Sequence, residues 1–146
     1  MYNLLESASR YILRISSGLT RQLDSFVEGS SMTPQEARVL QFIAVSEKAI
    51  YQKDLETEYG CTAATISELI GNMEKKGLIR RETDPDDHRR KRLFANPAIG
   101  QKVRAMVIKM AEMEKKLTEG IDEENIRIFL GVAKQMSENI PPSGGR

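Results

Sequence analysis

The sequence predicts a mainly α-helical fold that contains one small β-hairpin. Apolar residues recur every three or four positions along most of the 146-residue chain, which is the spacing of amphipathic helices. That spacing is interrupted near the middle, where Asp84-Pro85-Asp86-Asp87 separates two short runs that are typical of strands. We therefore expect helices on both sides of a hairpin.

Composition indicates an ordinary soluble protein. A content of 40% hydrophobic and 29% charged residues is typical of a globular domain, and the length suffices for a core. The single cysteine excludes an internal disulfide framework. The longest apolar stretches are too short to cross a membrane, and the N-terminus lacks the pattern of a signal peptide. We therefore expect a cytoplasmic protein without a membrane partner.

The first half of the chain predicts four helices. A long amphipathic helix covers 4–27 and ends near Gly29. Thr33-Pro34-Gln35-Glu36 has the pattern of a capping box and starts a second helix. That helix is expected to bury Ala37, Leu40, Ile43 and Ala44. A third helix covers 52–59, and a fourth begins at Thr62 and ends at Gly77, which is a suitable C-terminal cap.

The second half begins with the hairpin, whose strands are expected at 78–83 and 89–95. Asn96-Pro97 then starts a fifth helix of about 24 residues with a heptad-like apolar seam, roughly 36 Å long. Asp122 caps a last helix, which Pro141-Pro142 ends.

Positive charge is concentrated between Lys75 and Arg92. This segment holds eight basic and four acidic side chains, a local charge of +4 in a chain whose net charge is +1. Concentrated positive charge on an otherwise mildly acidic protein is typical of a surface that binds a polyanion, although a solvated run of charges is the alternative.

Three short helices followed by a β-hairpin form the element order of a winged helix-turn-helix. A tight turn at 59–61 would let the fourth helix reach the major groove of DNA, which is about 12 Å wide. The hairpin, or wing, would reach along the backbone or into the minor groove. The expected organisation is an N-terminal dimerisation helix at 1–31, a winged helix-turn-helix lobe at 32–95, C-terminal dimerisation helices at 96–140 and a flexible tail at 141–146.

The first half of the fourth helix carries small and hydroxyl-bearing side chains, which allow close approach to DNA. Thr65 and Ser67 can donate hydrogen bonds to phosphates or base edges, and Ala63 or Ala64 can meet a thymine methyl group. Thr62 and Thr65 can instead be a helix cap and its partner. The candidates are Thr62, Ala63, Ala64, Thr65, Ser67 and Glu68, with Gln52 and Lys53 as candidates for the DNA backbone.

Several segments resemble the MarR family of bacterial regulators. They are the fourth helix, its ending Lys75-Lys76-Gly77-Leu78-Ile79 and the wing Asp84-Pro85-Asp86-Asp87-His88-Arg89, and the order of the flanking long helices matches as well. The resemblance implies that Asp87 braces the wing while Arg89 enters the minor groove, where a guanidinium suits the negative potential. Arg90 and Lys91 are expected to add phosphate contacts. An exposed Arg89 that only pairs with Asp87 is the alternative.

The chain departs from the family pattern in two places. The family usually has arginine after the wing aspartate, where this chain has His88, its only histidine. His88 is either a neutral surface residue or a source of modest pH dependence. Past the wing, Ala95-Asn96 replaces the usual Leu-Thr, and Gly100 follows one residue later than expected. Cys61, just before the fourth helix, is a half-buried structural residue or a redox-sensitive thiol.

A homodimer follows from the apolar stripes of the first, fifth and sixth helices, which three helices alone can scarcely cover. Pairing across a two-fold axis would set two recognition helices one DNA turn apart, about 34 Å. The alternative is an intramolecular bundle. The candidate dimerisation residues are Leu4, Tyr11, Ile12, Met110, Met113, Leu117, Ile126 and Leu130. The resemblance also implies a small aromatic or lipophilic effector between the dimer region and the DNA-binding lobe.

The functional prediction is a sequence-specific regulator of transcription that binds double-stranded DNA at a pseudo-palindromic site, a repressor that a small effector releases. The alternative is a winged-helix module that docks an acidic protein partner. We expect no enzyme, no cofactor and no metal, because the sequence has no Gly-rich phosphate loop, zinc-ligand spacing or nucleophile elbow.

Overall fold

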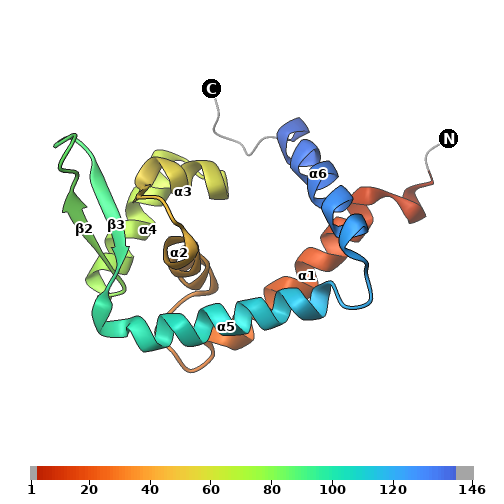
Figure 1. Cartoon of the computed structure of the whole chain (residues 1–146), viewed down its shortest axis with the longest axis horizontal. Coiled ribbons are helices and arrows are strands. Elements are labelled where there is room, and N and C mark those ends of the chain that lie inside the picture. Colours follow the sequence, from red (N-terminus) through yellow and green to blue (C-terminus); the bar gives the residue numbers. More distant parts are fainter. Residues whose placement is uncertain (1–2, 141–146) are drawn as a thin grey trace. The chain divides into compact units, whose positions relative to one another are not determined.

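The computed structural model describes residues 3–140 (Figure 1). Contacts divide the chain between Arg38 and Val39 into two compact units, which are described separately. Helices account for most of the described residues, and the strands form one small antiparallel sheet. The predicted fold class is therefore confirmed. No helix within 3–140 is both long enough and apolar enough to cross a membrane.

The first unit contains a short 3-10 helix, η1 (Leu4–Glu6), and α1 (Ala8–Val27) in place of one continuous helix. Ser7 separates them because its backbone is extended and its side chain accepts a hydrogen bond from the Arg10 N–H, at 3.4 Å. This is the usual behaviour of serine at a helix N-terminus. Gly29 follows α1 with a φ of +76°, a conformation that glycine adopts without strain.

The predicted capping box at the start of α2 (Pro34–Val45) is confirmed. Thr33 Oγ1 accepts from the Glu36 N–H at 3.2 Å, and Glu36 Oε2 accepts from the Thr33 N–H at 2.9 Å. Ala37 and Leu40 are buried as predicted. The prediction for Ala44 is wrong: this residue is exposed, because it borders an open cavity at the end of α2.

The second unit holds the next two helices, α3 (Gln52–Tyr59) and α4 (Ala63–Lys75), which match their predicted bounds closely. Gly60 allows the tight turn between them, with a φ of +60°. Leu55 of α3 is completely buried. So are three residues of α4 that lie on one helical face, namely Ile66, Ile70 and Met73. The opposite face of α4 remains exposed.

The sheet has the strand order β1-β3-β2, one strand more than predicted. Figure 1 labels its two longer strands, β2 and β3. Its strands are β1 (Ile50–Tyr51), β2 (Ile79–Thr83) and β3 (Lys91–Ala95). Ile50 pairs with Leu93, and Thr83 pairs with Lys91 at the loop end of the hairpin. The prediction that β3 starts at Arg89 is wrong. Arg90 donates its N–H to the Asp87 carbonyl at 2.9 Å, so 84–90 forms a loop.

Gly77 ends α4 with a φ of +70°. The Gly77 N–H bonds to the Glu74 carbonyl at 3.0 Å and the Leu78 N–H to the Met73 carbonyl at 2.9 Å, which together form a Schellman motif. Asn96, which follows β3, closes the same corner. Its side-chain amide donates to the Gly77 carbonyl at 2.8 Å, and its N–H donates to the Leu78 carbonyl at 2.9 Å.

The fifth helix is shorter than predicted. Asn96 caps a 3-10 turn, η2 (Pro97–Ile99), and the α-helix proper is α5 (Gly100–Leu117). Gly120, with a φ of +78°, lies in the turn that precedes α6 (Glu123–Asn139). The predicted cap at Asp122 is confirmed, since its carboxylate accepts from the Asn125 N–H at 2.9 Å. The expected helix end at Pro141-Pro142 and the tail lie outside the described residues.

Candidate nucleic-acid interface

The start of α4 presents an exposed stretch that only the buried Ile66 interrupts. All six candidates named from the sequence are exposed there: Thr62, Ala63, Ala64, Thr65, Ser67 and Glu68. Ile66, between them, points into the core. Thr62 caps the helix, because its hydroxyl oxygen accepts from the Thr65 N–H at 3.2 Å and donates to Thr65 Oγ1 at 3.0 Å. The exposed residues thus present small side chains and hydroxyl groups, which allow a ligand to approach the helix closely.

The start of α3 adjoins this stretch. The Gln52 amide donates to the Ala63 carbonyl and to Glu56 Oε1, each at 3.2 Å, and so joins the starts of α3 and α4. Lys53 extends into solvent and pairs with Glu56 at 3.3 Å. Gln52 therefore links α3 to α4 through a hydrogen bond. Its predicted contact with the DNA backbone would be an additional role. Lys53 is free to turn toward an anion, because exposed ion pairs of this kind are weak.

The wing loop carries an arginine that is almost entirely in solvent. The Arg89 side chain is 91% exposed, and its Nε lies 3.2 Å from Asp87 Oδ1. The Arg89 N–H also donates to Asp87 Oδ1, at 3.1 Å. Two hydrogen bonds from Arg89 lower the pKa of Asp87. The bond from the side chain has the larger effect and the bond from the backbone the smaller. Asp87 thus remains ionised and binds the guanidinium through Nε and Nη2, while the Arg89 side chain stays almost fully exposed to solvent.

Asp84 anchors the other end of the loop, a role that the sequence analysis did not assign. The residue is only 2% exposed. Its Oδ1 accepts from the Asp86 N–H at 2.8 Å, and its Oδ2 accepts from the Tyr51 hydroxyl and from Arg92 Nε, the latter at 3.4 Å. Chiefly because of the Tyr51 bond, the pKa of Asp84 falls to about 2. The Asp84-Pro85-Asp86 order signals an Asx turn, but nothing local signals Tyr51.

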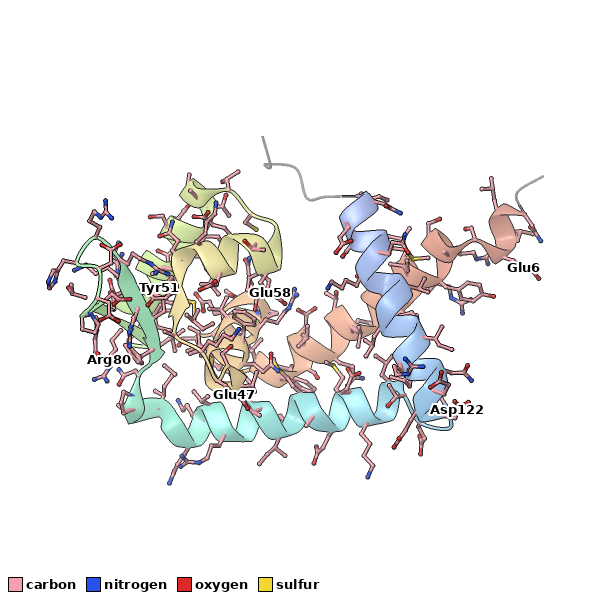
Figure 2. All side chains as sticks on the ribbon, turned by 45° about the horizontal axis from the view of Figure 1, so that its top comes forward. Glu6, Glu47, Tyr51, Glu58, Arg80 and Asp122 are labelled. Carbon is pink, nitrogen blue, oxygen red and sulfur yellow. The ribbon has the colours of Figure 1, made fainter. Side chains whose placement is uncertain are left out.

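The two arginines of β2 lie on opposite faces of the strand, as alternation requires. Arg81 reaches α4, where its Nε and Nη2 lie 2.9 and 2.8 Å from the two oxygens of Glu74. That hydrogen-bonded pair lowers the pKa of Glu74. Arg80, labelled in Figure 2, pairs with Glu82 at 3.0 Å and lies over the Phe94 ring, 5.5 Å from its centroid.

A cleft of about 330 Å³ lies between the start of α3 and the wing. Five of its lining side chains are basic and one is acidic, Glu56, which already pairs with Lys53. The basic residues are Lys53, Arg81, Arg89, Arg90 and Lys91. Fixed positive charge converging on a concave surface is suited to a phosphate group. The structure therefore brings the predicted residues of α3 and the wing to one place.

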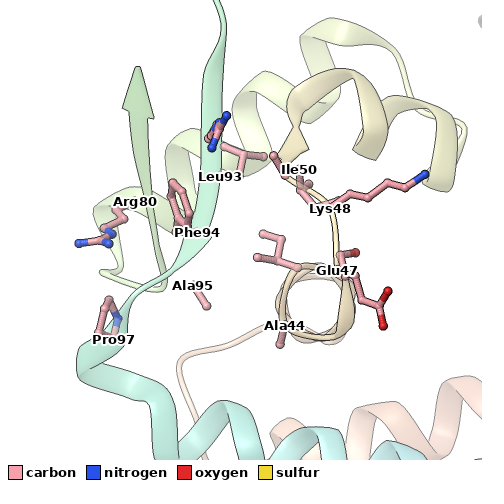
Figure 3. Close-up of a pocket in the computed structure, with 13 residues that line it drawn as sticks. Ala44, Glu47, Lys48, Ile50, Arg80, Leu93, Phe94, Ala95 and Pro97 are labelled. Carbon is pink, nitrogen blue, oxygen red and sulfur yellow. The ribbon is translucent and has the colours of Figure 1, made fainter. Parts of the chain in front are cut away.

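A second cavity, of about 470 Å³, lies on the other side of β3. Figure 3 shows Phe94 and Ala95 on one side of it and Ala44, Glu47 and Ile50 on the other. Its walls are mostly apolar, and three cations reach its lining, namely Lys48, Arg80 and Arg92. An apolar body with an anionic group would match this lining.

Comparisons with known proteins agree on one family. The family model described as MarR family matches residues 30–90, which hold the helix-turn-helix and most of the wing. Over 106 residues the chain is 29% identical to the transcriptional regulator HosA of Escherichia coli O111:H-, an alignment that covers 72% of this chain and 77% of HosA. Over its helix-turn-helix and most of its wing the chain is thus similar to the MarR family.

Solved structures extend this likeness to the flanking helices. The transcription regulator MarR from Oenococcus oeni PSU-1 matches with a TM-score of 0.83 at 22% identity, over 90% of this chain and 99% of that one. MepR of S. aureus, in a complex with DNA, matches with a TM-score of 0.79 at 25% identity, over 93% of this chain and 99% of MepR. The winged-helix fold with long flanking helices is thus shared.

The candidate dimerisation residues fall into two groups. Met110 is buried within the chain, and Met113 and Ile126 are half-buried. The other five are exposed: Leu4, Tyr11, Ile12, Leu117 and Leu130. The exposed group lies on η1, α1, α5 and α6, where further large apolar side chains such as Phe129 also reach solvent. These helices therefore leave much apolar surface uncovered in the single chain.

The sequence left two interpretations open for each of two further residues, His88 and Cys61. His88 is exposed at the wing loop, where it has room either for solvent or for a nearby phosphate. Cys61 is half-buried in the turn before α4, and its thiol lies 3.5 Å from the Tyr59 carbonyl. This position agrees with a structural cysteine that fills the turn, while its redox behaviour stays an open prediction.

Proposed function

We propose that this transcription regulator binds double-stranded DNA with α4 in the major groove and the wing loop in the adjacent minor groove. One observation carries the proposal: the exposed start of α4 and the almost fully exposed Arg89 belong to the same lobe. Small residues on α4 permit close approach to base edges, and a projecting guanidinium suits the negative potential of a narrow minor groove. We expect the protein to act in the cytoplasm, where it can reach chromosomal DNA.

The basic cleft supports a contact to the DNA backbone between these two elements. Lys53 at the start of α3 and Lys91 at the start of β3 both line it, and a phosphate bound in the cleft would be attracted by both. Such contacts set the register of a protein on the duplex, while α4 and Arg89 supply the sequence-dependent contacts. The MepR–DNA complex, whose protein shares this fold, supports binding to DNA.

Binding as a homodimer to a pseudo-palindrome is part of the proposal. The exposed apolar residues of η1, α1, α5 and α6 support it, because a soluble chain gains stability by covering a surface of that kind. Two-fold symmetry of the protein would then be matched by two half-sites in the DNA.

The main test is a fluorescence anisotropy titration on a duplex that the wild-type protein selects from a random pool. We expect Arg89→Ala to weaken binding about fivefold to a hundredfold, on the order of 1–3 kcal/mol, and affinity to fall steeply with salt. Arg127→Ala is the matched control, since Arg127 is an exposed arginine on α6 that pairs with Glu124. Undiminished, salt-insensitive binding by Arg89→Ala would favour the alternative, a module that docks a protein partner.

The last part of the proposal is that the protein is a repressor, which a small aromatic or lipophilic effector releases from DNA. The apolar cavity beside Phe94, with cations reaching its lining, supports an aromatic carboxylate as the ligand class. The same titration repeated in sodium benzoate tests this part, and release of the DNA is expected. If saturating benzoate leaves the affinity unchanged, an aromatic carboxylate is not the effector of this cavity.

A further inference from the structure

We propose that Tyr51 is a positioning residue that fixes the pose of the wing, so that Arg89 is already aimed before DNA arrives. This inference rests on the proposed function, in which the wing meets the minor groove. It adds a residue that lies outside the wing and outside α4, and that no sequence pattern connects with DNA.

The backbone of Tyr51 is held from two directions. On one side, β1 pairs with β3, and Tyr51 stands opposite Arg92. On the other side, Tyr51 is the N-cap of α3, and its N–H donates to Asp54 Oδ2 at 2.8 Å. The side chain therefore projects from a rigid junction between the sheet and α3, near the base of the wing in Figure 2.

The Tyr51 side chain holds the loop through two separate contacts. Its hydroxyl donates to Asp84, a buried carboxylate at the first position of the loop. Its ring lies under the Arg90 guanidinium, whose Cζ is 3.6 Å from the ring centroid, at the last position of the loop. One side chain thus binds both ends of the 84–90 segment, which also pair with each other through the Asp84 N–H and the Arg90 carbonyl, 2.9 Å apart.

This arrangement leaves little freedom for the residues between the two ends. Arg90 donates its N–H to the Asp87 carbonyl, and Asp87 holds the backbone and side chain of Arg89. Arg89 therefore projects from a loop whose two ends are fixed to the helix-turn-helix. A loop without these contacts would have to be ordered when DNA binds, and that loss of entropy weakens association.

A positioning role makes a prediction that a general contribution to folding does not. If Tyr51 acts through Arg89, removing its hydroxyl should weaken binding only while Arg89 is present. A tyrosine that merely stabilises the lobe would weaken binding equally with or without Arg89, and would lower the melting temperature in step. The difference is measurable as a non-additive pair of substitutions.

The experiment is a double-mutant cycle with Tyr51→Phe and Arg89→Ala, titrated on the duplex selected by the wild-type protein. Tyr51→Phe keeps the ring under Arg90 and removes the hydroxyl. We expect it to weaken binding about tenfold in the native background, as for a lost hydrogen bond to a charged group, and less than twofold when Arg89 is alanine. Tyr51→Leu, which also removes the ring, should weaken binding further. Tyr59→Phe, on α3 with its ring 6.3 Å from that of Phe42, is the control tyrosine and should have little effect.

Amide hydrogen exchange of the free protein provides a second measurement that does not involve DNA. Tyr51→Phe should speed exchange at the Asp84 and Arg90 amides and leave exchange in α4 unchanged. Unaltered exchange in the loop, or an equal loss of affinity in both backgrounds, would overturn the positioning role. Full affinity of Arg89→Ala would instead overturn the proposed function, and the hydrogen-exchange result would then show separately whether Tyr51 orders the wing.

Discussion

Three aspartates in the wing loop have different environments and therefore different roles. Asp84 is buried and accepts three hydrogen bonds from Tyr51, Asp86 and Arg92. Asp87 is half-buried and pairs with Arg89. Asp86 is exposed, and its N–H donates to Asp84. A buried carboxylate is tolerated only when its oxygens are hydrogen-bonded, so Asp84 is the structural member of the three.

The depressed pKa of Asp84 predicts how its contribution to stability depends on pH. Its pKa is about 2 in the folded protein, below the ordinary value near 3.9. The stabilisation is thus fully present above the ordinary pKa and is lost as the pH falls through the folded pKa. We expect Asp84→Asn to be less stable than the native protein at pH 7, by a difference that shrinks between about pH 4 and pH 2.

Urea unfolding at a series of pH values measures this difference. Asp86→Asn is the matched control, because its carboxylate belongs to the same turn but is exposed. A stability difference for Asp84→Asn that stays constant down to pH 2 would contradict the assigned role of its charge. Titration of Asp84 should not contribute to the pH dependence of DNA binding near neutral pH, because its pKa is about 2.

At the scale of elements, the left-handed glycine at the end of α4 gives a prediction of its own. Gly77→Ala places a Cβ at ordinary contact distance from Asn96 Nδ2, 3.9 Å, but in an unfavourable backbone conformation, at a φ of +70°. We expect a loss of about 1–2 kcal/mol of unfolding free energy, measured by urea titration. Gly71→Ala, inside the same helix with nothing near its Cβ, should instead gain roughly 0.5–1 kcal/mol. Equal effects at both positions would refute the argument.

Elements that depend on neighbouring residues were predictable from the sequence. The capping box at Thr33, the cap at Asp122 and the end of α4 at Gly77 involve groups only a few residues apart. The exposed face of α4 follows from the same local periodicity. β1 was missed because two residues carry no alternation, and α5 was predicted too long because the apolar seam continues past its end at Leu117.

The candidate site was predictable only in part for the same reason. Arg89 and the start of α4 were found from local composition and family resemblance. The basic cleft and the contact of Tyr51 with Asp84 join residues from separate elements, the latter 33 positions apart. No local pattern encodes such a pairing, so it required the structure.

At the scale of the whole molecule, the prediction concerns association. Leu130 on α6 is 60% exposed, and a charge there would oppose burial against a second copy. We expect Leu130→Glu to sediment as a monomer under conditions where the native protein is a dimer. Gln135→Glu adds the same charge at an exposed polar position of α6 and should remain dimeric. A Leu130→Glu protein that stays dimeric would place the interface elsewhere.

The two hydrogen bonds of Asn96 have a mechanical consequence. One reaches the Gly77 carbonyl and the other the Leu78 carbonyl, so the residue that begins η2 is tied to the residues that end α4. Two hydrogen bonds therefore restrict movement at the junction between α4 and η2. We therefore expect a rotation at the start of α5 to be transmitted to α4 through these two hydrogen bonds.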